Sequence, residues 1–421
     1  MKAGPIKKTV DNIIRILTYD PMLRGKIAID EFSVRGLALG ALPWNASDGK
    51  RLWSDTDDAG LQWYLENKYN ITGKDKVMNA LLLVSEQHRI NEVKDYLLSL
   101  TWDGVPRVNT VLHDYLGAQQ NEYVAAVARK SLAAAVARVM EPGCKYDYVP
   151  VLVGPQGIGK STFLATLGKD WYSDSLQSFE GKEAAEMIQG IWINEVGEMA
   201  GYNKSESAVV KQFLSKRDDI YRQAYGRRTA KFPRKCVFFG TSNTYDFLKD
   251  LTGNRRFWPV DVGQLPAAKS VWEDLPNEVD QIWAEALHYY RQQEALYFET
   301  PELQSLADAE QDSHRETNVK EGLIKAFLEK EVPVNYYNMD LSARRMYWNG
   351  TAMAAETMPR EKTCALELWC ECLGGDPRYL KRADAMEINQ IMSHLAGWGR
   401  NRSPRRYGYC GMQKGFEVIK M

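Results

Sequence analysis

One nine-residue motif constrains the fold of this chain more than any other feature. The apolar run YVPVLV at 148–153 is followed by GPQGIGKST at 154–162 and then by the helix-forming stretch FLATL at 163–167. The pattern GxxxxGK[ST] between a strand and a helix is typical of a loop that binds phosphate groups. The predicted phosphate-binding residues are Gly154, Pro155, Gln156, Gly157, Ile158, Gly159, Lys160, Ser161 and Thr162.

The residue types in this loop suit a nucleoside triphosphate. Glycines allow successive backbone N–H groups to turn toward the phosphates, and the start of the following helix adds positive character. Lys160 is expected to reach the β- and γ-phosphates, and the Ser161 hydroxyl to take a coordination position of Mg²⁺. The alternative is a glycine-rich turn without a ligand, but strand, glycines, Lys and Ser occur together here. The predicted ligands are therefore ATP and Mg²⁺.

Composition sets limits on the class of protein. A chain of 421 residues can hold two or three domains, and 44% hydrophobic with 26% charged residues is ordinary globular composition. Because the net charge is −1, contact with nucleic acid would have to come from local basic patches. We expect no membrane span and no signal peptide, since no uncharged apolar run reaches about 18 residues. The six cysteines form no CxxC pair, and a cytoplasmic location is expected.

The order of apolar runs predicts an α/β fold. Between about 148 and 262, β-rich runs alternate with helical stretches, which is typical of a parallel sheet covered by helices. A helix is expected over 122–140, with Arg129 and Arg138 on its solvated face. The predicted organisation is a mixed α/β region at 1–104, a P-loop ATPase domain at 105–300, a helical connector at 301–360 and a basic winged-helix-like module at 361–421.

Acidic side chains follow the second predicted strand of the sheet. A P-loop needs a carboxylate at the end of a neighbouring strand to hold Mg²⁺, and a base to orient the attacking water. The segment IWINEVGE at 191–198 supplies Glu195 at the end of the strand and Glu198 three residues later. Glu195 is therefore, with Ser161, a predicted metal-site residue. Surface charge after a strand is the alternative interpretation for each acid.

Two further segments offer groups for phosphate chemistry. Asn243 ends the β-rich run 236–243, where it could hydrogen-bond the γ-phosphate or the attacking water, although Thr-Ser-Asn is also common in turns. Arg255 and Arg256 follow a Gly-Asn turn and could present a guanidinium to the charge that develops on phosphate. A structural pair between arginine and carboxylate is the alternative there.

These pieces, in this order, resemble the virulence-associated protein E family. Its members are P-loop ATPases of phages, prophages and phage satellites, related to superfamily 3 helicases within the AAA+ group. The resemblance is specific over about 100–300 and rests on GPQGIGKSTF at 154–163, WINEVGEM at 192–199, YRQAYGRR at 221–228, FFGTSN at 238–243 and LTGNRRFWPV at 251–260.

The resemblance implies roles for several of these residues. Lys160 and Ser161 correspond to the Walker A pair, Glu195 to the Walker B acid and Asn243 to sensor 1. Either Arg255 or Arg256 would be the arginine finger. In the general helicase pattern the two acids adjoin, whereas here two residues separate Glu195 from Glu198, so either could be the base.

The resemblance also implies a function. It favours an ATP-dependent DNA helicase or translocase that works as an oligomeric, hexameric ring. An initiator that assembles on origin DNA without unwinding it is the second possibility, and a GTPase-type switch, whose guanine-specificity motif is only faintly matched, is the third.

Two basic segments are candidates for DNA contact. Six positive charges and no acid lie between 222 and 235, with aromatic residues among them, a composition that suits single-stranded DNA. A hairpin there could project into the pore of a ring; a charged face or a contact to a neighbouring subunit's nucleotide is equally open. The predicted DNA-binding residues are Arg222, Tyr225, Arg227, Arg228 and Lys231 here, and Arg402, Arg405 and Arg406 in the C-terminal loop, where a solubilising basic tail is the alternative.

Overall fold

The structure is a computed structural model that describes residues 6–198, 204–222, 228–248, 254–316 and 319–419. The chain divides into two compact units. The larger comprises Met1–Phe247 with Gly253–His314, and the smaller comprises Leu248–Thr252 with Arg315–Met421. No helix within the described ranges is long and apolar enough to cross a membrane.

The N-terminal part of the larger unit is mixed α/β, as the sequence predicts. Its sheet has the strand order β3-β2-β1-β4, in which β1 pairs antiparallel with β2 and parallel with β4. Apolar side chains of the first three helices pack with Ile27 and Ala38 of the sheet into one hydrophobic core. The elements are α1 (Val10–Tyr19), β1 (Ile27–Asp30), β2 (Arg35–Leu39), β3 (Lys50–Leu52), α2 (Asp55–Tyr69), α3 (Lys74–Gln87), β4 (Arg89–Ile90) and α4 (Glu92–Ser99).

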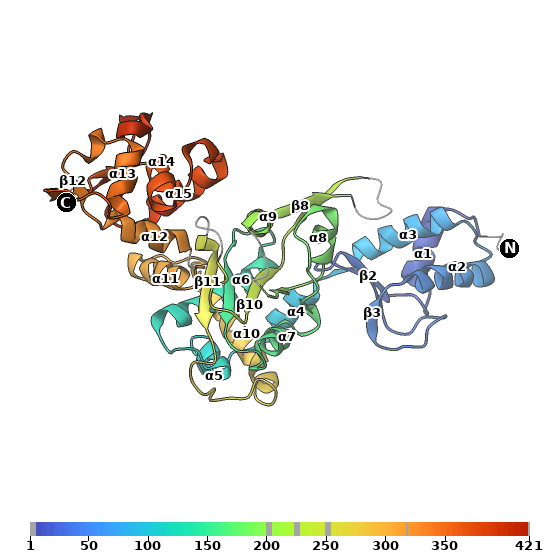
Figure 1. The fold of residues 1–421 in the computed structure, drawn as a ribbon. Helices are drawn as coiled ribbons and strands as arrows, with labels where there is room; N and C mark the ends of the chain where they lie inside the picture. The colour runs from blue at the N-terminus through green and yellow to red at the C-terminus, as the bar shows by residue number, and fades with distance from the viewer. Residues whose placement is uncertain (1–5, 199–203, 223–227, 249–253, 317–318, 420–421) are drawn as a thin grey trace, which may run out of the picture. The chain divides into compact units, whose positions relative to one another are not determined.

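The centre of the larger unit is a parallel sheet with the strand order β11-β5-β10-β7-β6. Its strands β10 and β11 are labelled in Figure 1. All neighbouring strands run parallel, which confirms the predicted α/β class. The strand before the phosphate-binding motif, β5, lies between β10 and β11, and β10 separates it from the acidic strand β7. The strands are β5 (Val149–Val153), β6 (Tyr172–Ser173), β7 (Ile193–Val196), β10 (Val237–Ser242) and β11 (Phe257–Asp261).

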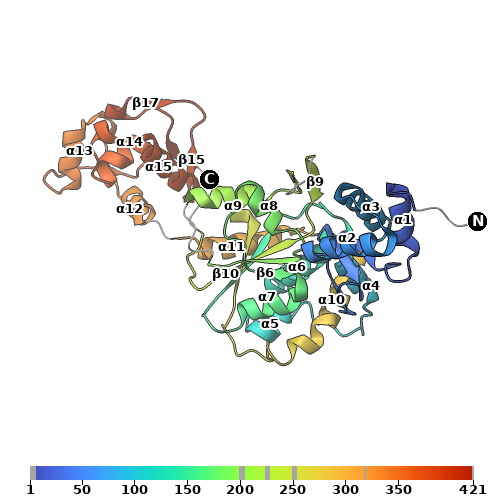
Figure 2. The ribbon, with the colours of Figure 1, turned by 90° about the vertical axis from the view of Figure 1, so that its right-hand side faces the viewer.

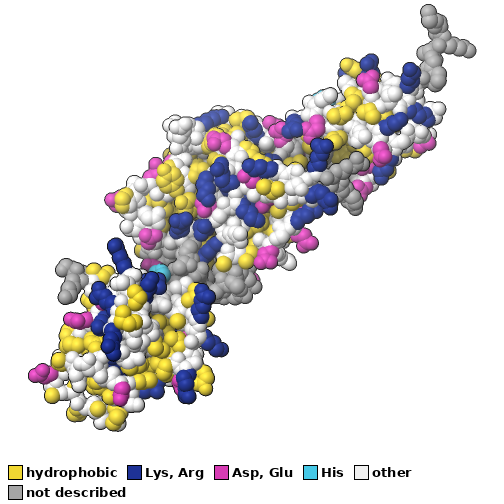
Figure 3. Space-filling model, turned by 90° about the horizontal axis from the view of Figure 1, so that it is seen from above, with side chains coloured by type: hydrophobic (Ala, Val, Ile, Leu, Met, Phe, Trp, Pro, Cys, Tyr) yellow, Lys and Arg dark blue, Asp and Glu magenta, His cyan; other side chains and the backbone are white. Residues whose placement is uncertain are grey.

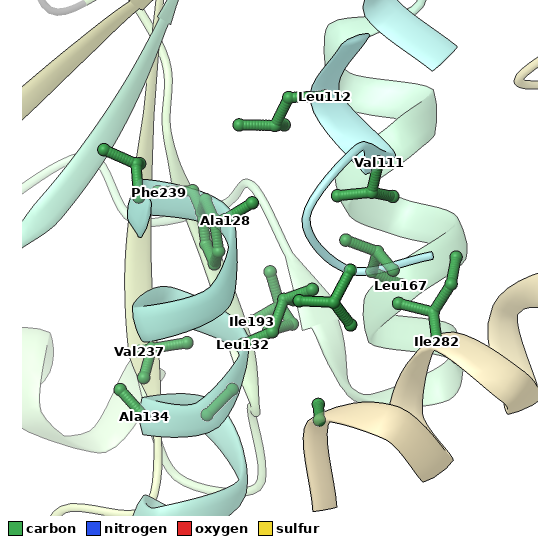
Figure 4. Packing of buried hydrophobic residues seen from close by; sticks show 14 of the residues in the cluster. Val111, Leu112, Ala128, Leu132, Ala134, Leu167, Ile193, Val237, Phe239 and Ile282 are labelled. Carbon is green, nitrogen blue, oxygen red and sulfur yellow. The ribbon is translucent and has the colours of Figure 1, made fainter. Parts of the chain in front are cut away.

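Helices cover both faces of this sheet, because the side chains of a strand alternate between its faces. Val237 and Phe239 of β10 point into a core shared with helices on one face (Figure 4). Phe238 meets Phe213 of the opposite face, with ring centroids 6.0 Å apart. In Figure 2 the strands lie between α9 on one side and α7 on the other. The helices of the unit are α5 (Val111–Leu116), α6 (Glu122–Met140), α7 (Lys160–Gly168), α8 (Gly181–Met187), α9 (Lys204–Leu214), α10 (Leu275–Arg291) and α11 (Pro301–Ser313).

The helix predicted over 122–140 is present as α6, but the prediction for its arginines is wrong. Arg138 is only 2% exposed, and its guanidinium donates to the backbone oxygens of Tyr146 and Arg234. Arg129 is half-buried and pairs with Glu294 at 3.0 Å. The reason is that α6 packs against the sheet, α5, α10 and α11, so it has little solvated face.

The smaller unit contains helices and a short antiparallel sheet with the order β14-β18-β15. Its core collects apolar residues from α12, α14, the π-helical turn and α15, among them Ile324, Leu368 and Ile391, around Phe416 of β18. The elements are α12 (Val319–Leu328), β12 (Val332–Pro333), α13 (Leu341–Trp348), β13 (Thr357–Met358), β14 (Lys362–Thr363), α14 (Ala365–Glu367), a π-helical turn (Leu368–Cys372), α15 (Arg382–His394), β15 (Trp398–Arg400), β16 (Arg405–Arg406), β17 (Met412–Gln413) and β18 (Phe416–Val418).

Candidate functional site

A cleft of about 430 Å³ opens at the carboxyl ends of β5, β7 and β10. In open parallel sheets this edge is where ligands bind. The cleft brings most of the predicted phosphate-binding residues together with both predicted acids and the predicted sensor. Its lining residues are Gln156, Gly157, Gly159, Lys160, Ser161, Thr162, Glu195, Gly197, Glu198, Thr241, Ser242, Asn243 and Trp272.

Three glycines shape the phosphate-binding loop, each for a physical reason. Gly157 and Gly159 have φ values of +84° and +92°, a conformation that residues with a side chain rarely adopt. At Gly154 a Cβ atom would lie 2.3 Å from the carbonyl oxygen of Val262, so only glycine allows this close approach. Helix α7 begins directly after the loop, at Lys160, and its N-terminus adds partial positive charge to the cleft.

Lys160 is 7% exposed, and its ammonium has only neutral hydrogen-bond partners among the described residues. Its Nζ atom donates to the carbonyl oxygens of Gly154 (2.6 Å) and Pro155 (2.8 Å) and to Oδ1 of Asn243 (3.0 Å). No carboxylate of the described residues pairs with it. Burial lowers the pKa of Lys160, and the charge of Glu195 opposes this shift. A buried cation without an ion-pair partner favours an incoming anion such as phosphate.

The Glu195 carboxylate accepts hydrogen bonds on both oxygens. Its Oε1 atom accepts from the hydroxyls of Ser161 (2.7 Å) and Thr241 (2.8 Å), and its Oε2 atom accepts from Tyr172 (2.5 Å). A hydroxyl and a carboxylate side by side are the oxygen ligands that Mg²⁺ prefers when it also binds phosphate. Ser161 and Glu195 therefore fit the predicted metal site.

Glu198 differs from Glu195 in its surroundings. Glu198 is exposed at the cleft, and its backbone has a φ of +49°, which is uncommon for a residue with a side chain. Such outliers concentrate at functional sites. Asn194, the residue before Glu195 in β7, is 1% exposed, and its Nδ2 atom has no hydrogen-bond partner among the described residues.

The two predicted finger arginines are not among the described residues that line the cleft. Both belong to a 3₁₀ turn (Asn254–Arg256) just before β11. The Nε atom of Arg256 donates to Ser215 Oγ at 2.8 Å and lies 3.6 Å from Asp147 Oδ2. Arg255 is exposed, and we find no hydrogen bond or ion pair between it and any described residue.

The basic segment is a hairpin, as predicted, since β8 (Asp218–Tyr221) pairs antiparallel with β9 (Ala230–Pro233). Arg222 and Arg228 are exposed at the ends of the connecting loop, whereas Tyr225 and Arg227 lie outside the described residues. Lys231 is exposed on β9 but pairs with Asp218 at 3.0 Å. Lys231 is thus less free to contact DNA than the sequence of the segment indicates.

Two positive charges of the basic segment, Arg234 and Lys235, instead anchor the hairpin. Arg234 is 2% exposed and binds Asp219 through two hydrogen bonds, of 2.7 and 3.0 Å. Lys235 donates to the backbone oxygen of Phe32 in the N-terminal part of the same unit.

In the smaller unit the predicted basic loop is exposed. Arg402, Arg405 and Arg406 all lie on the surface, and Arg405 pairs with Glu417 of β18 at 2.5 Å. On the face of this unit that Figure 3 shows at the lower left, Lys and Arg side chains lie among hydrophobic ones.

Thr241, Tyr172 and Trp272 are among the residues near the cleft that sequence reasoning missed. Thr241 could have been found, because it precedes the predicted sensor Asn243 by two residues in the same β-rich run. Tyr172 lies on a strand of two residues, and Trp272 lies in a loop 110 residues beyond Thr162, so neither has a local signal.

A phosphate-binding motif between a strand and a helix of a parallel sheet defines the class: this is a P-loop α/β protein. The model of the virulence-associated protein E-like domain matches residues 97–316, just over half of the chain, and the chain belongs to this family. The resemblance seen in the sequence is thereby confirmed.

Solved structures of the C-terminal region of NrS-1 are also similar to the chain. One apo structure is 10% identical, with 92% of this chain and 86% of that chain covered and a TM-score of 0.46. Two A-form apo structures of that region are 10% identical as well, with 98% and 99% of this chain and 100% of theirs covered, and TM-scores of 0.49 and 0.48. No curated protein matches the sequence.

Proposed function

We propose that this protein is an ATP-hydrolysing motor that acts on DNA as an oligomeric, hexameric ring, a helicase or translocase of a phage, prophage or phage-satellite replication system. One observation carries the ATPase part of the proposal. The buried Lys160 ammonium, held by neutral acceptors alone, faces a cleft that also contains the Ser161–Glu195 pair. Membership of the family supports the remainder.

The cleft residues divide the chemistry of hydrolysis among themselves. Lys160 exchanges its two carbonyl acceptors for β- and γ-phosphate oxygens, and the loop N–H groups bind the remaining oxygens. Ser161 and Glu195 would hold Mg²⁺, whose charge would offset that of the phosphates. Glu198, exposed at the cleft, orients the attacking water and accepts its proton. Asn243 keeps contact with Lys160 and the γ-phosphate.

The proposal assigns different roles to the two arginines. Arg256 is an anchor, because Ser215 and Asp147 occupy its guanidinium. Arg255 is exposed and belongs to a turn that does not contribute to the cleft of its own chain. In a ring it would reach the nucleotide of the neighbouring subunit, where an arginine finger stabilises the transition state.

The DNA-binding role draws on two surfaces. The first is the β8–β9 hairpin with Arg222 and Arg228 at its loop. The second is the C-terminal module, for which the succession β14, α14, α15, β15, loop and β18 supports the proposal of a winged helix. In that fold α15 would enter the major groove and the loop with Arg402 and Arg406 would contact the backbone.

We propose the same domain boundaries that the sequence predicts. Residues 1–104 form the leading region, 105–300 the AAA+-like ATPase domain, 301–360 the connector and 361–421 the winged-helix-like module. The module is also what favours the second candidate function, an initiator that uses ATP to assemble on origin duplex DNA without unwinding it.

ATPase and strand-displacement assays test the proposal. We expect ATP hydrolysis that single-stranded DNA stimulates, a native mass of several subunits, and unwinding of a forked substrate. Lys160→Ala should lower hydrolysis by about 10²–10³-fold while leaving the thermal melt unchanged, and Lys182→Ala on α8 is a matched control. Near-normal hydrolysis by folded Lys160→Ala would refute the ATPase, and hydrolysis without unwinding would favour the initiator.

A further inference from the structure

Among the described residues, Trp272 is the one aromatic side chain that lines the candidate nucleotide cleft. All twelve tryptophans lie within the described residues, and only Trp63 and Trp272 are more than half exposed, at 54% and 59%. The indole N–H of Trp272 has no hydrogen-bond partner among the described residues, whereas the indoles of Trp192 and Trp283 donate to backbone oxygens. A large apolar ring left open to solvent at a ligand cleft is a candidate contact for an apolar part of the ligand.

Hydrogen bonds brace the backbone turn that carries this ring. The Ser270 hydroxyl accepts hydrogen bonds from the backbone N–H groups of Trp272 (3.2 Å) and Glu273 (3.1 Å), and Asp274 accepts from the N–H of Ser270 (2.7 Å). Just before this turn, the N–H of Lys269 donates to the Asp114 carbonyl oxygen at 2.9 Å. Trp272 therefore extends from a braced turn ahead of α10, so its backbone has little ordering entropy left to lose on binding.

The ring stands against the phosphate-binding loop itself. A Cβ atom built on Gly159 would lie 3.3 Å from two carbon atoms of the indole, so the ring lies beside the loop and only a residue without a side chain leaves room for it there. The same loop contains the buried Lys160 that favours phosphate. The cleft thus has one end suited to anionic oxygens and, beside it, an exposed aromatic face.

We propose that Trp272 is the stacking platform for the nucleobase of the bound nucleotide. The inference rests on the proposed function and goes beyond it, because it assigns the base end of the ligand to a named residue. An aromatic ring stacks on any base, since every base has a π face, and this contact contributes measurably to affinity. Trp272 is a binding residue in this role and takes no part in the transfer of the phosphoryl group.

Comparing ATP with inorganic tripolyphosphate, which lacks a base, isolates this role. We expect Trp272→Ala to weaken ATP binding roughly 5- to 150-fold, to leave tripolyphosphate binding unchanged, and Trp272→Phe to recover most of the loss. Trp63→Ala, at the other exposed tryptophan, should bind both ligands as the wild type does. Native mass measured on each variant checks that assembly is intact.

The possible outcomes separate the two proposals. Unchanged ATP affinity in Trp272→Ala, or an equal loss for ATP and tripolyphosphate, would overturn the stacking role, because the residue would then be neutral or would only support the loop. An altered native mass with normal ATP affinity would assign Trp272 to a subunit interface instead. If the wild-type protein bound neither ligand, the proposed function would fail as well.

Discussion

The Tyr172 hydroxyl donates to Oε2 of Glu195 at 2.5 Å, across the neighbouring strands β6 and β7. Burial, and then this hydrogen bond, raise the pKa of Tyr172 well above its usual range, so the phenol stays a donor at any ordinary pH. With Ser161 and Thr241 on the other oxygen, the carboxylate has a fixed orientation toward the phosphate-binding loop.

Tyr172→Phe should therefore impair metal use more than nucleotide binding. Removing a hydrogen bond to a metal-binding carboxylate commonly costs about 10–100-fold in metal affinity or activity. We expect the Mg²⁺ concentration for half-maximal hydrolysis to rise, while the affinity for ATP without Mg²⁺ stays the same. An unchanged Mg²⁺ dependence would mean that Tyr172 does not position Glu195.

The roles of Glu195 and Glu198 can be told apart by replacing each with glutamine, which has nearly the same shape. Glu195→Gln should weaken Mg²⁺-dependent ATP binding, because Glu195 lies against Ser161. Glu198→Gln should bind ATP normally but hydrolyse it about 10²–10⁴-fold more slowly, as expected for the loss of a general base. The measurements are ATP affinity with Mg²⁺ and single-turnover hydrolysis. If Glu195→Gln is the variant that traps bound ATP and Glu198→Gln turns over normally, the two roles are reversed.

A buried histidine makes stability depend on pH. His314 Nε2 lies 2.8 Å from Asp261 Oδ1 at the end of β11. Burial alone would lower the pKa of His314, but the hydrogen bonds to Asp261 and to the Glu310 backbone leave it above the ordinary 6.5. The pair therefore contributes stability that is fully present below pH 6.5 and is lost as the pH rises through the folded-state pKa.

The melting temperature should accordingly fall as the pH is raised above the ordinary histidine range. His314→Gln should melt about 2–4 °C lower than wild type at low pH and converge with it once His314 is neutral. A constant difference at all pH values would show that packing, not charge, is what His314 contributes.

Local signals account for the parts that the sequence predicted. The loop at 154–162 needs only its own glycines and flanking strand and helix, and the polar ends of β7 and β10 identify Glu195 and Asn243, because parallel strands end at one edge. The sequence does not predict the burial of Arg138, because elements far along the chain pack against α6 and cover it. The pairings of Lys231 with Asp218 and of Arg405 with Glu417 likewise depend on strand partners that no local pattern specifies. Trp272 reaches the cleft through tertiary packing alone.

The last prediction concerns the exposed Arg255. Because Arg256 is engaged by Ser215 and Asp147, Arg256→Ala should lower the melting temperature, whereas Arg255→Ala should melt like the wild type. If Arg255 acts on a neighbouring subunit, Arg255→Ala should lose about 10³–10⁵-fold in hydrolysis while binding ATP normally.

Mixed rings test the action between subunits directly. Lys160→Ala subunits keep the finger, and Arg255→Ala subunits keep the phosphate-binding lysine, so a mixture should regain partial hydrolysis that neither variant shows alone. The gain should depend on the mixing ratio, because a competent site needs one subunit of each kind side by side. No recovery in mixed rings of confirmed native mass, or full activity of a strictly monomeric preparation, would mean that Arg255 does not act in trans.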